Sequence, residues 1–460
     1  MNHLVIAPVL LPLLMGILLL LLDRANPFLP RILSVLAVLV QIRLALALLA
    51  ATSSGDILVY ALGNWPAPFG IVLVADRLAA WLLVITALLA LFALLYAIRG
   101  EDRAGRHFHV LFQLQLFGLN GAFLTGDLFN LFVFFEILLL ASYGLLLHGG
   151  GRRRIRAGLH FVVVNLVGST LFLFAVGTLY GVRGALNMAD LAMKVAAAPP
   201  ENIPLVRAAG LLLFGVFALK AALLPFYLWL PAAYARTSAP AAALFAIMTK
   251  VGAYGILRVY ALIFGADAGR AANLIEPWLL PLALATLLVG MAGVVAATLF
   301  LLADAITRRR GELGDRLDPG PTIANSGLLG GLFFVTAVAV AGLPPLSGFL
   351  GKFLTLRAAL DHPLLPWIMG TVLVAGLLGL IALARTGSLL FYRALPPEAT
   401  APETGPALAA ETVPIIGLLL LGLGLTIGAG PAFDQARAIA DQTLQPQTYI
   451  QAVMNPGGKP

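Results

Sequence analysis

Long apolar runs alternate with short polar segments along almost the whole chain. A helix needs about 20 consecutive apolar residues to cross the hydrocarbon core of a bilayer, and most of the runs reach that length. The pattern therefore predicts an all-α, polytopic membrane helix bundle of about twelve spans. It contains no alternating strand pattern and no separate soluble domain. The expected spans are residues 3–22, 32–51, 76–98, 108–125, 128–148, 158–181, 206–230, 240–264, 278–304, 326–360, 364–391 and 411–430.

Arginines are distributed unevenly between the polar segments. Alternate loops are rich in arginine and the opposite loops are poor, and Lys and Arg accumulate in the cytoplasmic loops of membrane proteins. We therefore expect the arginine-rich loops on the cytoplasmic side and both termini outside. The rich set holds Arg24, Arg31, Arg99, Arg103, Arg106, Arg152, Arg153, Arg154, Arg156, Arg236, Arg308, Arg309, Arg310, Arg316, Arg385 and Arg393, and the poor set holds Arg183, Lys194, Arg207 and Arg270.

The amino-acid composition narrows the class of protein further. Of the 460 residues, 61% are hydrophobic and 11% are charged, whereas soluble domains carry about 25% charged residues. The net charge of +8 comes from loop residues, which favours an orientation signal over nucleic-acid binding. Cysteine is absent, which excludes disulfides, thiolate metal sites and iron–sulfur clusters held by this chain. The first run has no basic segment before it and no small-residue cleavage site, so we expect a retained span.

The most unusual stretch is residues 211–257, where two lysines lie inside apolar runs. A lysine near mid-membrane costs about 2.5–3.5 kcal/mol, so Lys220 and Lys250 should each have a partner or a task. Pro225 and Pro231 follow Lys220 within the same run. Proline breaks a helix, and irregular backbone at membrane depth survives only where protein or a water-filled cavity covers it. Two buried amines beside a broken helix indicate a path for ions or protons.

Glu136 lies near the middle of another apolar run. A carboxylate in that position is either neutral or paired with a cation, and the two buried lysines are the candidate partners. Small changes in hydration would then move a proton between the sites, which is what a proton relay requires.

A second interrupted run, residues 326–360, contains the adjacent Pro344 and Pro345, and Lys352 follows within a few residues. Its likeness to the first broken run is loose, but both place proline and lysine close together at mid-span. Two interrupted spans in separate halves of a chain are typical of an inverted-repeat transporter.

Other polar residues have simpler interpretations. Asp76 and Asp127 lie near span ends, where we expect hydrated helix caps. His160 and Asp304 also lie near span ends, and we retain them as accessory candidates for the relay. Arg258 is expected either to snorkel to the interface or to pair with a neighbour. The mid-span charges themselves have a structural alternative, in which they pair only to hold helices together.

Three segments resemble a known family. They are FNLFVFFEI (129–137), LKAALLPFYLWLPAAYARTSAPAAALFAIMTKVGAYGI (219–256) and AGLPPLSGFLGKF (341–353). They are similar to the antiporter-like subunits shared by respiratory NADH:quinone oxidoreductase and the Mrp-type multisubunit monovalent cation/proton antiporters. The segment LFLLADAITRRRGELGDRLDPGP (299–321) resembles the D-subunit branch of the Mrp type more closely. The resemblance covers nearly the whole chain.

This resemblance implies a fold of about fourteen helices with two inverted repeats, each holding a proton half-channel. By motif, Glu136 matches the glutamate of the family's fifth helix, Lys220 the lysine of its broken seventh helix and Lys250 that of its eighth. Lys352 matches the lysine of the second broken helix. The resemblance implies that the Glu136–Lys220 pair acts as a switch, and that its opening drives a proton from Lys220 toward Lys250.

The chain departs from the family after the eighth span. The family has three helices there and this chain has one, with a join near residues 290–306. About two spans are therefore missing, together with a histidine that the family uses between Lys250 and the exit lysine. The shortening is compatible with a deletion that reduces activity, with a faulty gene prediction, or with a working variant in which water fills the gap. The expected parts are 1–106 (first three spans), 107–265 (first repeat), 266–395 (shortened second repeat) and 396–460 (loop, last span and tail).

Three functions are compatible with these observations. The first is a subunit of a multisubunit Na⁺ or K⁺/proton antiporter that moves protons through the buried Glu/Lys relay. The second is a proton-pumping membrane subunit of a quinone- or hydrogenase-linked oxidoreductase, and the third is a scaffold that has lost transport. The resemblance implies membrane subunits as partners in a bacterial cytoplasmic membrane. We expect no metal, no cofactor and no nucleic acid to be bound by this chain.

Overall fold

The computed structural model describes residues 3–22, 28–290, 297–318, 320, 323–392 and 409–455, without the side chains of residues 285–290 and of Glu312. Eight helices in these ranges are long and apolar enough to span a membrane, and four shorter apolar helices accompany them. The all-α polytopic bundle is thereby confirmed. Helices suit this apolar composition because they satisfy their backbone hydrogen bonds internally, which hydrocarbon surroundings demand.

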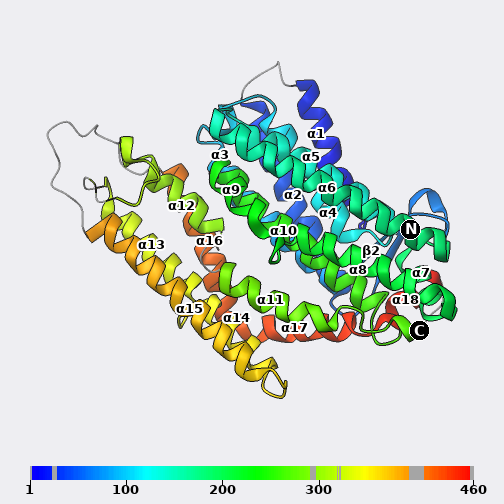
Figure 1. Cartoon of the computed structure of the whole chain (residues 1–460). Coiled ribbons are helices and arrows are strands. Elements are labelled where there is room, and N and C mark those ends of the chain that lie inside the picture. The colour runs from blue at the N-terminus through cyan, green and yellow to red at the C-terminus, as the bar shows by residue number, and fades with distance from the viewer. Residues whose placement is uncertain are drawn as a thin grey trace.

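The first part of the chain forms a compact group of helices (Figure 1). Its members are α1 (Ala7–Leu22), α2 (Leu29–Thr52), α3 (Arg77–Ala97), α4 (Phe108–Leu124), α5 (Leu128–Leu147) and α6 (Arg152–Arg183). Helix α4 packs against both α1 and α5, while α2 packs against α3 and α5 against α6. Helix α6 begins earlier than the apolar run predicts, so the arginines that precede the run form its first turns.

A short antiparallel hairpin connects α2 to α3. Strand β1 (Leu58–Ala61) pairs with β2 (Val72–Ala75), and Leu58 lies opposite Ala75. All four residues of β2 are buried, so its sequence shows no alternation of polar and apolar positions. The hydrophobic pattern therefore missed this hairpin.

The seventh predicted span is interrupted. A short helix, α7 (Met188–Ala196), precedes α8 (Ile203–Lys220), which ends at the predicted relay lysine. A single 3₁₀ turn leads into α9 (Trp229–Arg236), and α10 (Ala239–Leu262) follows.

The two prolines of this region differ in their roles. Pro225 lies in the interruption itself, whereas Pro231 lies in the first turn of α9. The first turn of a helix tolerates proline because its N–H groups have no acceptor within the helix. The helix is therefore broken at Pro225 and not at Pro231.

The second broken span has the same plan. Helix α13 (Ser326–Ala341) and helix α14 (Ser347–Ala358) flank a short non-helical segment that contains Pro344 and Pro345. Each of the two breaks contains a cis peptide bond, at Leu224–Pro225 and at Pro344–Pro345.

The last part of the chain returns to the first. Helix α15 (Leu365–Gly387) ends in a π-helical turn (Ser388–Tyr392), and the last apolar span is α16 (Ala409–Ile427). The predicted tail forms two further helices, α17 (Ala429–Thr443) and α18 (Pro446–Met454). Helix α17 packs against α3, and α18 packs against α7 and β1, so the C-terminal helices lie beside the N-terminal group (Figure 1). The loop predicted before α16 falls largely in residues 393–408, outside the described residues.

The single span predicted at 278–304 is described as two helices, α11 (Glu276–Gly290) and α12 (Ala297–Thr307). Residues 291–296, which include the predicted join, lie outside the described residues. The two helices have different neighbours, since α11 packs against α15 while α12 packs against α10, α13 and α16.

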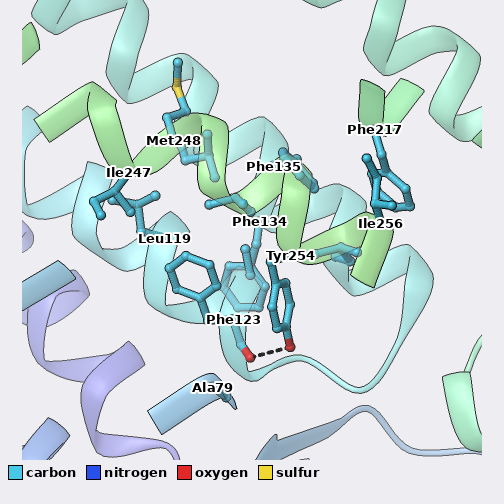
Figure 2. Close-up of a cluster of buried hydrophobic side chains, with 14 of the residues drawn as sticks. Ala79, Leu119, Phe123, Phe134, Phe135, Phe217, Ile247, Met248, Tyr254 and Ile256 are labelled. Atoms are coloured by element: carbon cyan, nitrogen blue, oxygen red, sulfur yellow. Dashed lines mark hydrogen bonds between the residues drawn. The ribbon is translucent and has the colours of Figure 1, made fainter. Parts of the chain in front are cut away.

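Buried hydrophobic side chains pack together where α10 lies against the first helices. Figure 2 shows side chains of α4, α5, α8 and α10 packed together, with Phe123 and Tyr254 at the centre. Their rings meet edge-on with centroids 5.3 Å apart, and the Tyr254 hydroxyl donates a hydrogen bond to the Phe123 carbonyl at 2.8 Å. This packing fixes α10 against α4 and holds it beside the broken span.

Candidate functional site

Lys220 is buried at the end of α8, with 3% of its surface exposed. Its ammonium donates hydrogen bonds to α6, reaching the Asn165 carbonyl at 3.3 Å, the Asn165 side-chain oxygen at 3.4 Å and the Ser169 hydroxyl at 3.2 Å. The ammonium also lies 6.0 Å from the centre of the Phe135 ring. Because Asn165 and Ser169 are four residues apart, they lie on one face of α6 and form a single acceptor site for the lysine.

Glu136 lies on α5, next to the phenylalanine that faces Lys220. Its side chain is partly buried, and one carboxylate oxygen is fully buried without a hydrogen-bond donor. Glu136 and Lys220 interact electrostatically, but the described contacts contain no direct salt bridge between them. A buried carboxylate oxygen without a donor is costly, so this site favours closer approach of a hydrogen-bond donor to Glu136.

The break beside Lys220 is held together by tertiary contacts. The indole of Trp229, which is 2% exposed, donates a hydrogen bond to the carbonyl of Leu219 at 3.1 Å. Helix α10 approaches the break through Gly252, where an added Cβ would lie only 2.4 Å from the Ala221 nitrogen. The interrupted backbone is thus covered by protein, as irregular backbone at membrane depth requires.

Lys250 lies on α10, two residues before Gly252, and its side chain is exposed on the surface of this chain. Its ammonium lies 3.4 Å from the hydroxyl of the adjacent Thr249. The structure therefore brings the backbone of α10 to the Lys220 break, but the described contacts do not connect the Lys250 amine with Glu136 or Lys220.

Lys352 lies on α14 and is half-buried. Its ammonium donates a hydrogen bond to the carbonyl of Ala341, the last residue of α13. The C-terminal end of a helix carries a partial negative charge, so this contact compensates the lysine in the second broken span. Among the described contacts, no hydrogen bond or ion pair connects Lys352 with Lys250.

The two accessory candidates occupy different settings. His160 is exposed on α6 and contacts neither Glu136 nor Lys220 in the described hydrogen bonds. Asp304 accepts hydrogen bonds from Arg99 at 2.5 Å, from Arg308 at 2.8 Å and from the Tyr96 hydroxyl at 2.8 Å. These partners make Asp304 part of a structural ion-pair cluster.

The same cluster contains a buried residue that the sequence analysis missed. Glu411, at the start of α16, pairs with Arg99, just after α3, and with Arg309, just after α12, the latter at 2.7 Å. The side chains of all three residues are 6–7% exposed. The cluster joins the first helices to the second broken half at the arginine-rich end of the molecule. The available signal for Glu411 in the sequence was that Arg99 and Arg309, its two partners, belong to the arginine-rich loops predicted to share one side of the membrane.

A second buried ion pair lies near the C-terminal end of α10. Arg258 forms a salt bridge with Asp76 at 2.6 Å, and the rings of Tyr254 and Tyr449 lie over its guanidinium at 5.2 and 5.1 Å. Asp76 also caps α3 by accepting a hydrogen bond from Ala79. The expectation that Arg258 snorkels or pairs is resolved in favour of pairing. Asp127 caps α5 through the backbone of Asn130. Both span-end carboxylates therefore cap helices as expected, but both are buried and not hydrated.

A third polar cluster lies in the loop before α4. The Asp102 carboxylate accepts hydrogen bonds from Arg31 at 2.6 Å and is 3.2 Å from the His109 ring. Burial tends to raise the pKa of Asp102, but the hydrogen bonds from His109 and Arg31 outweigh burial and hold this pKa below 3.8. His148, just beyond α5, contacts the Glu101 carbonyl at 2.9 Å, and burial lowers the pKa of its imidazole.

The arrangement can hold and transfer a proton. A carboxylate with an unpaired buried oxygen, a buried amine with three neutral acceptors and a helix break lie next to one another. Among the described residues, no group of three His, Asp or Glu side chains is arranged to hold a metal ion.

Comparison with known proteins places this geometry in context. The family model described as "NADH:quinone oxidoreductase/Mrp antiporter, TM" matches residues 125–296 and 282–379. The D subunit of a probable K(+)/H(+) antiporter of Rhizobium meliloti (strain 1021) is 38% identical, covering 99% of this chain and 98% of the relative. The D subunit of a Na(+)/H(+) antiporter of Alkalihalophilus pseudofirmus is 35% identical, covering 99% and 100%. One polypeptide of the Mrp complex from Dietzia sp. DQ12-45-1b superimposes with a TM-score of 0.85 at 27% identity, covering 98% and 99%.

The comparisons also bear on the shortened middle. The match with the Rhizobium protein extends over 533 aligned positions, whereas this chain has 460 residues, so at least 73 of those positions have no counterpart here. The family model is matched in two segments that meet at residues 282–296. The alignment shows that positions of the relative are missing here, and the two matched segments of the family model overlap at the predicted join.

Proposed function

The chain belongs to the NADH:quinone oxidoreductase/Mrp antiporter membrane family, and from this premise we propose that it is the D subunit of a multisubunit monovalent cation/proton antiporter. It is a multi-pass protein of a bacterial membrane. Relatives that match nearly its whole length are named as D subunits of K(+)/H(+) and Na(+)/H(+) antiporters. Its partners are then other membrane subunits, and its substrates are protons and Na⁺ or K⁺.

One observation carries the proposal for the site. Lys220 is buried at a helix break, beside Glu136, and is solvated by neutral oxygens of α6 and not by the carboxylate. In this conformation the Glu136–Lys220 pair is open, and the lysine proton is held by groups that carry no charge. Closing the pair would stabilise a protonated Lys220, and opening it would release that stabilisation. The pair can therefore gate a proton.

The remaining lysines continue the proposed path. The backbone of α10 lies against the Lys220 break at Gly252. A movement of the break would therefore displace α10, the helix that carries Lys250. Lys352 occupies the matching position beside the second break. No described contact connects Lys250 with Lys352, so water must bridge this part of the path in the shortened chain. Residues 107–265 and 266–395 act as the complete and the shortened repeat.

The arginine distribution supports an orientation for the subunit. Contacts join several arginine-rich segments to one another, among them the Arg31–Asp102, Arg99–Glu411 and Arg308–Glu101 pairs. A set of loops that meets at one end of the molecule fits the positive-inside rule. We place this end in the cytoplasm and both termini outside.

The test measures cation-dependent proton flux through the assembled complex in membrane vesicles. Glu136→Ala and Lys220→Ala should each abolish the flux, because each removes one member of the gate. Asp127→Asn, which changes a carboxylate that only caps α5, should leave it nearly unchanged. Flux at the wild-type level in Glu136→Ala would remove Glu136 from the mechanism. Copurification with flavin- or cluster-bearing subunits would assign the chain to an oxidoreductase complex instead.

A further inference from the structure

A basic hollow of about 400 Å³ lies between α6 and α9, away from the Glu136–Lys220 site. Its lining consists of Arg153, Arg156, Ala157, His160, Ala232 and Arg236. Every ionisable residue of the lining is a base, and all four of these side chains are exposed on the surface of the chain. The hollow thus combines three guanidinium groups and one imidazole around a floor of small apolar side chains.

The position of the hollow along the helices indicates its depth in the membrane. The arginines lie in the first turns of α6 and at the last residue of α9. Ala157 lies one turn further into α6 than Arg153, and Ala232 lies one turn before the end of α9. The three arginines are therefore at the level where a spanning helix leaves the hydrocarbon, and the alanines and His160 are on its apolar side.

The three arginines of the hollow carry uncompensated charge. In the part of the chain that the structure describes, no carboxylate pairs with Arg153, Arg156 or Arg236. The neighbouring Arg154 has a different role, since it donates hydrogen bonds to the backbone carbonyls of Arg236 and His148. Arg154 thereby ties the end of α9 to the start of α6 and keeps the two walls of the hollow together.

We propose that this hollow binds the phosphate headgroup of an anionic phospholipid. Guanidinium groups match phosphate oxygens with paired hydrogen bonds, and His160 offers a further ring N–H donor. Basic pockets between membrane helices on the cytoplasmic side are typical sites for anionic headgroups. The alanine floor gives room for the first carbons of an acyl chain, which favours a lipid over a free phosphate ion.

An occupied hollow would act on the broken span. Helix α6 carries Asn165 and Ser169, which hold the ammonium of Lys220, and α9 is the helix that resumes after the break. A headgroup bound between α6 and α9 therefore connects the two sides of the interruption. The lipid fixes the distance between the lysine's acceptors and the second half of the span.

Native mass spectrometry of the purified full chain tests the site. The protein is delipidated and then equilibrated with dioleoyl phosphatidylglycerol or with dioleoyl phosphatidylcholine, which share acyl chains and differ in headgroup charge. Wild type should retain the anionic lipid in preference to the zwitterionic one. Arg156→Gln and Arg236→Gln should each lower its retention about fivefold, the change that corresponds to about 1 kcal/mol per basic residue near an anionic surface.

Arg207→Gln is the matched control, because Arg207 is exposed in α8 and lies outside the hollow. It should leave lipid retention unchanged, and all three variants should unfold at the wild-type temperature in phosphatidylcholine. Equal retention of phosphatidylglycerol by wild type and the Arg156→Gln/Arg236→Gln double variant would overturn the proposal. An equal loss of phosphatidylglycerol retention in Arg207→Gln would show that retention depends on the overall charge of the chain and not on the hollow. Displacement of the lipid by an equal concentration of inorganic phosphate would identify a phosphate-ion site instead.

Discussion

Lys220 shows how a single charge is accommodated inside this bundle. The sequence reveals the lysine because it interrupts an apolar run, and it reveals Glu136 in the same way. The acceptors that solvate the lysine are harder to predict, because Asn165 and Ser169 precede it by 55 and 51 residues and come from another helix. Their spacing of four residues on an otherwise apolar helix was a usable signal. Pairing that polar face with Lys220 required the tertiary structure.

Ser169→Ala should slow cation-dependent proton flux about tenfold. The substitution removes one of the three hydrogen bonds to the Lys220 ammonium, and a hydrogen bond to a charged group contributes about 1.5–3 kcal/mol. The matched control is Thr170→Ala, since Thr170 is exposed and its hydroxyl binds only the carbonyl of Leu166 on its own helix. Both variants are measured in the assembled complex. Equal fluxes in the two variants would show that Ser169 does not support Lys220.

Asp102 gives a pH-dependent contribution to stability. Burial raises the pKa of Asp102, but His109 and Arg31 lower it further, so this pKa lies below the ordinary value of 3.8. A carboxyl group whose pKa is lower in the folded state contributes stability that is fully present above the unfolded-state pKa. That stability is lost as the pH falls through the folded-state pKa. The relevant window therefore lies below pH 3.8.

Asp102→Asn should lower the thermal unfolding temperature of the purified chain at neutral pH, because it removes the anion that Arg31 and His109 contact. The difference from wild type should shrink only below pH 3.8, as the Asp102 carboxyl takes up a proton first in the unfolded and then in the folded state. Thermal unfolding in detergent across this pH range measures both effects. A difference that grows toward acid pH would contradict the sign of the pKa shift. Asp56→Asn, at an exposed carboxylate in the loop after α2, is the control.

At the scale of the elements, the broken helices were predictable and their detailed construction was not. Prolines within apolar runs mark both interruptions, and the sequence placed them within a few residues of their lysines. Pro231 carries the same local signal as Pro225, yet it lies inside α9, where the first turn tolerates it. The choice between the two prolines depends on Trp229 and on the approach of α10, which no local pattern contains.

Gly252→Ala should destabilise the contact between α10 and the break. The added methyl group would lie 2.4 Å from the Ala221 nitrogen, so the helix must move, and overpacking of this kind costs about 1–3 kcal/mol. Gly215→Ala is the matched control, because an added Cβ there meets no atom within 4 Å and alanine favours helix by about 1 kcal/mol. Thermal unfolding should therefore shift down in the first variant and not in the second. Wild-type stability of Gly252→Ala would mean that the break does not rest on α10.

At the scale of the whole molecule, the loops group as the arginine count predicts. Contacts connect Arg99, Arg309 and Glu411, which lie after α3, after α12 and at the start of α16, far apart in sequence. The sequence predicts that such loops share a side of the membrane, since an even number of missing helices keeps the later ones in the same orientation. It does not predict that a glutamate at the start of the last span is the buried partner. That role arises only when α16 returns to α3.

Lys250 lies on an exposed side of α10. In the predicted relay this lysine receives a proton from Lys220, which requires that it be enclosed or in contact with water. Its side chain is exposed on the surface of this chain, whereas Ala243, seven residues earlier on the same helix, is 0% exposed. If about two helices are missing at the predicted join, their absence explains why one side of α10, at Lys250, Ala253 and Leu257, is left uncovered. Water must then reach this side for the path toward Lys352 to continue.

Lys250→Cys should react readily with a polar, membrane-impermeant thiol reagent in the assembled complex. The chain contains no cysteine, so each single-cysteine variant reports one position. Ala243→Cys should react slowly because the position is buried. Leu166→Cys should also react slowly, because Leu166 is 59% exposed on an apolar helix face that we expect to contact lipid. The three labelling rates distinguish a position in contact with water from one in contact with lipid and from one buried in protein. Labelling of Lys250→Cys as slow as that of Leu166→Cys would mean that lipid covers the gap, and a proton would then have no route from Lys250 toward the second broken helix.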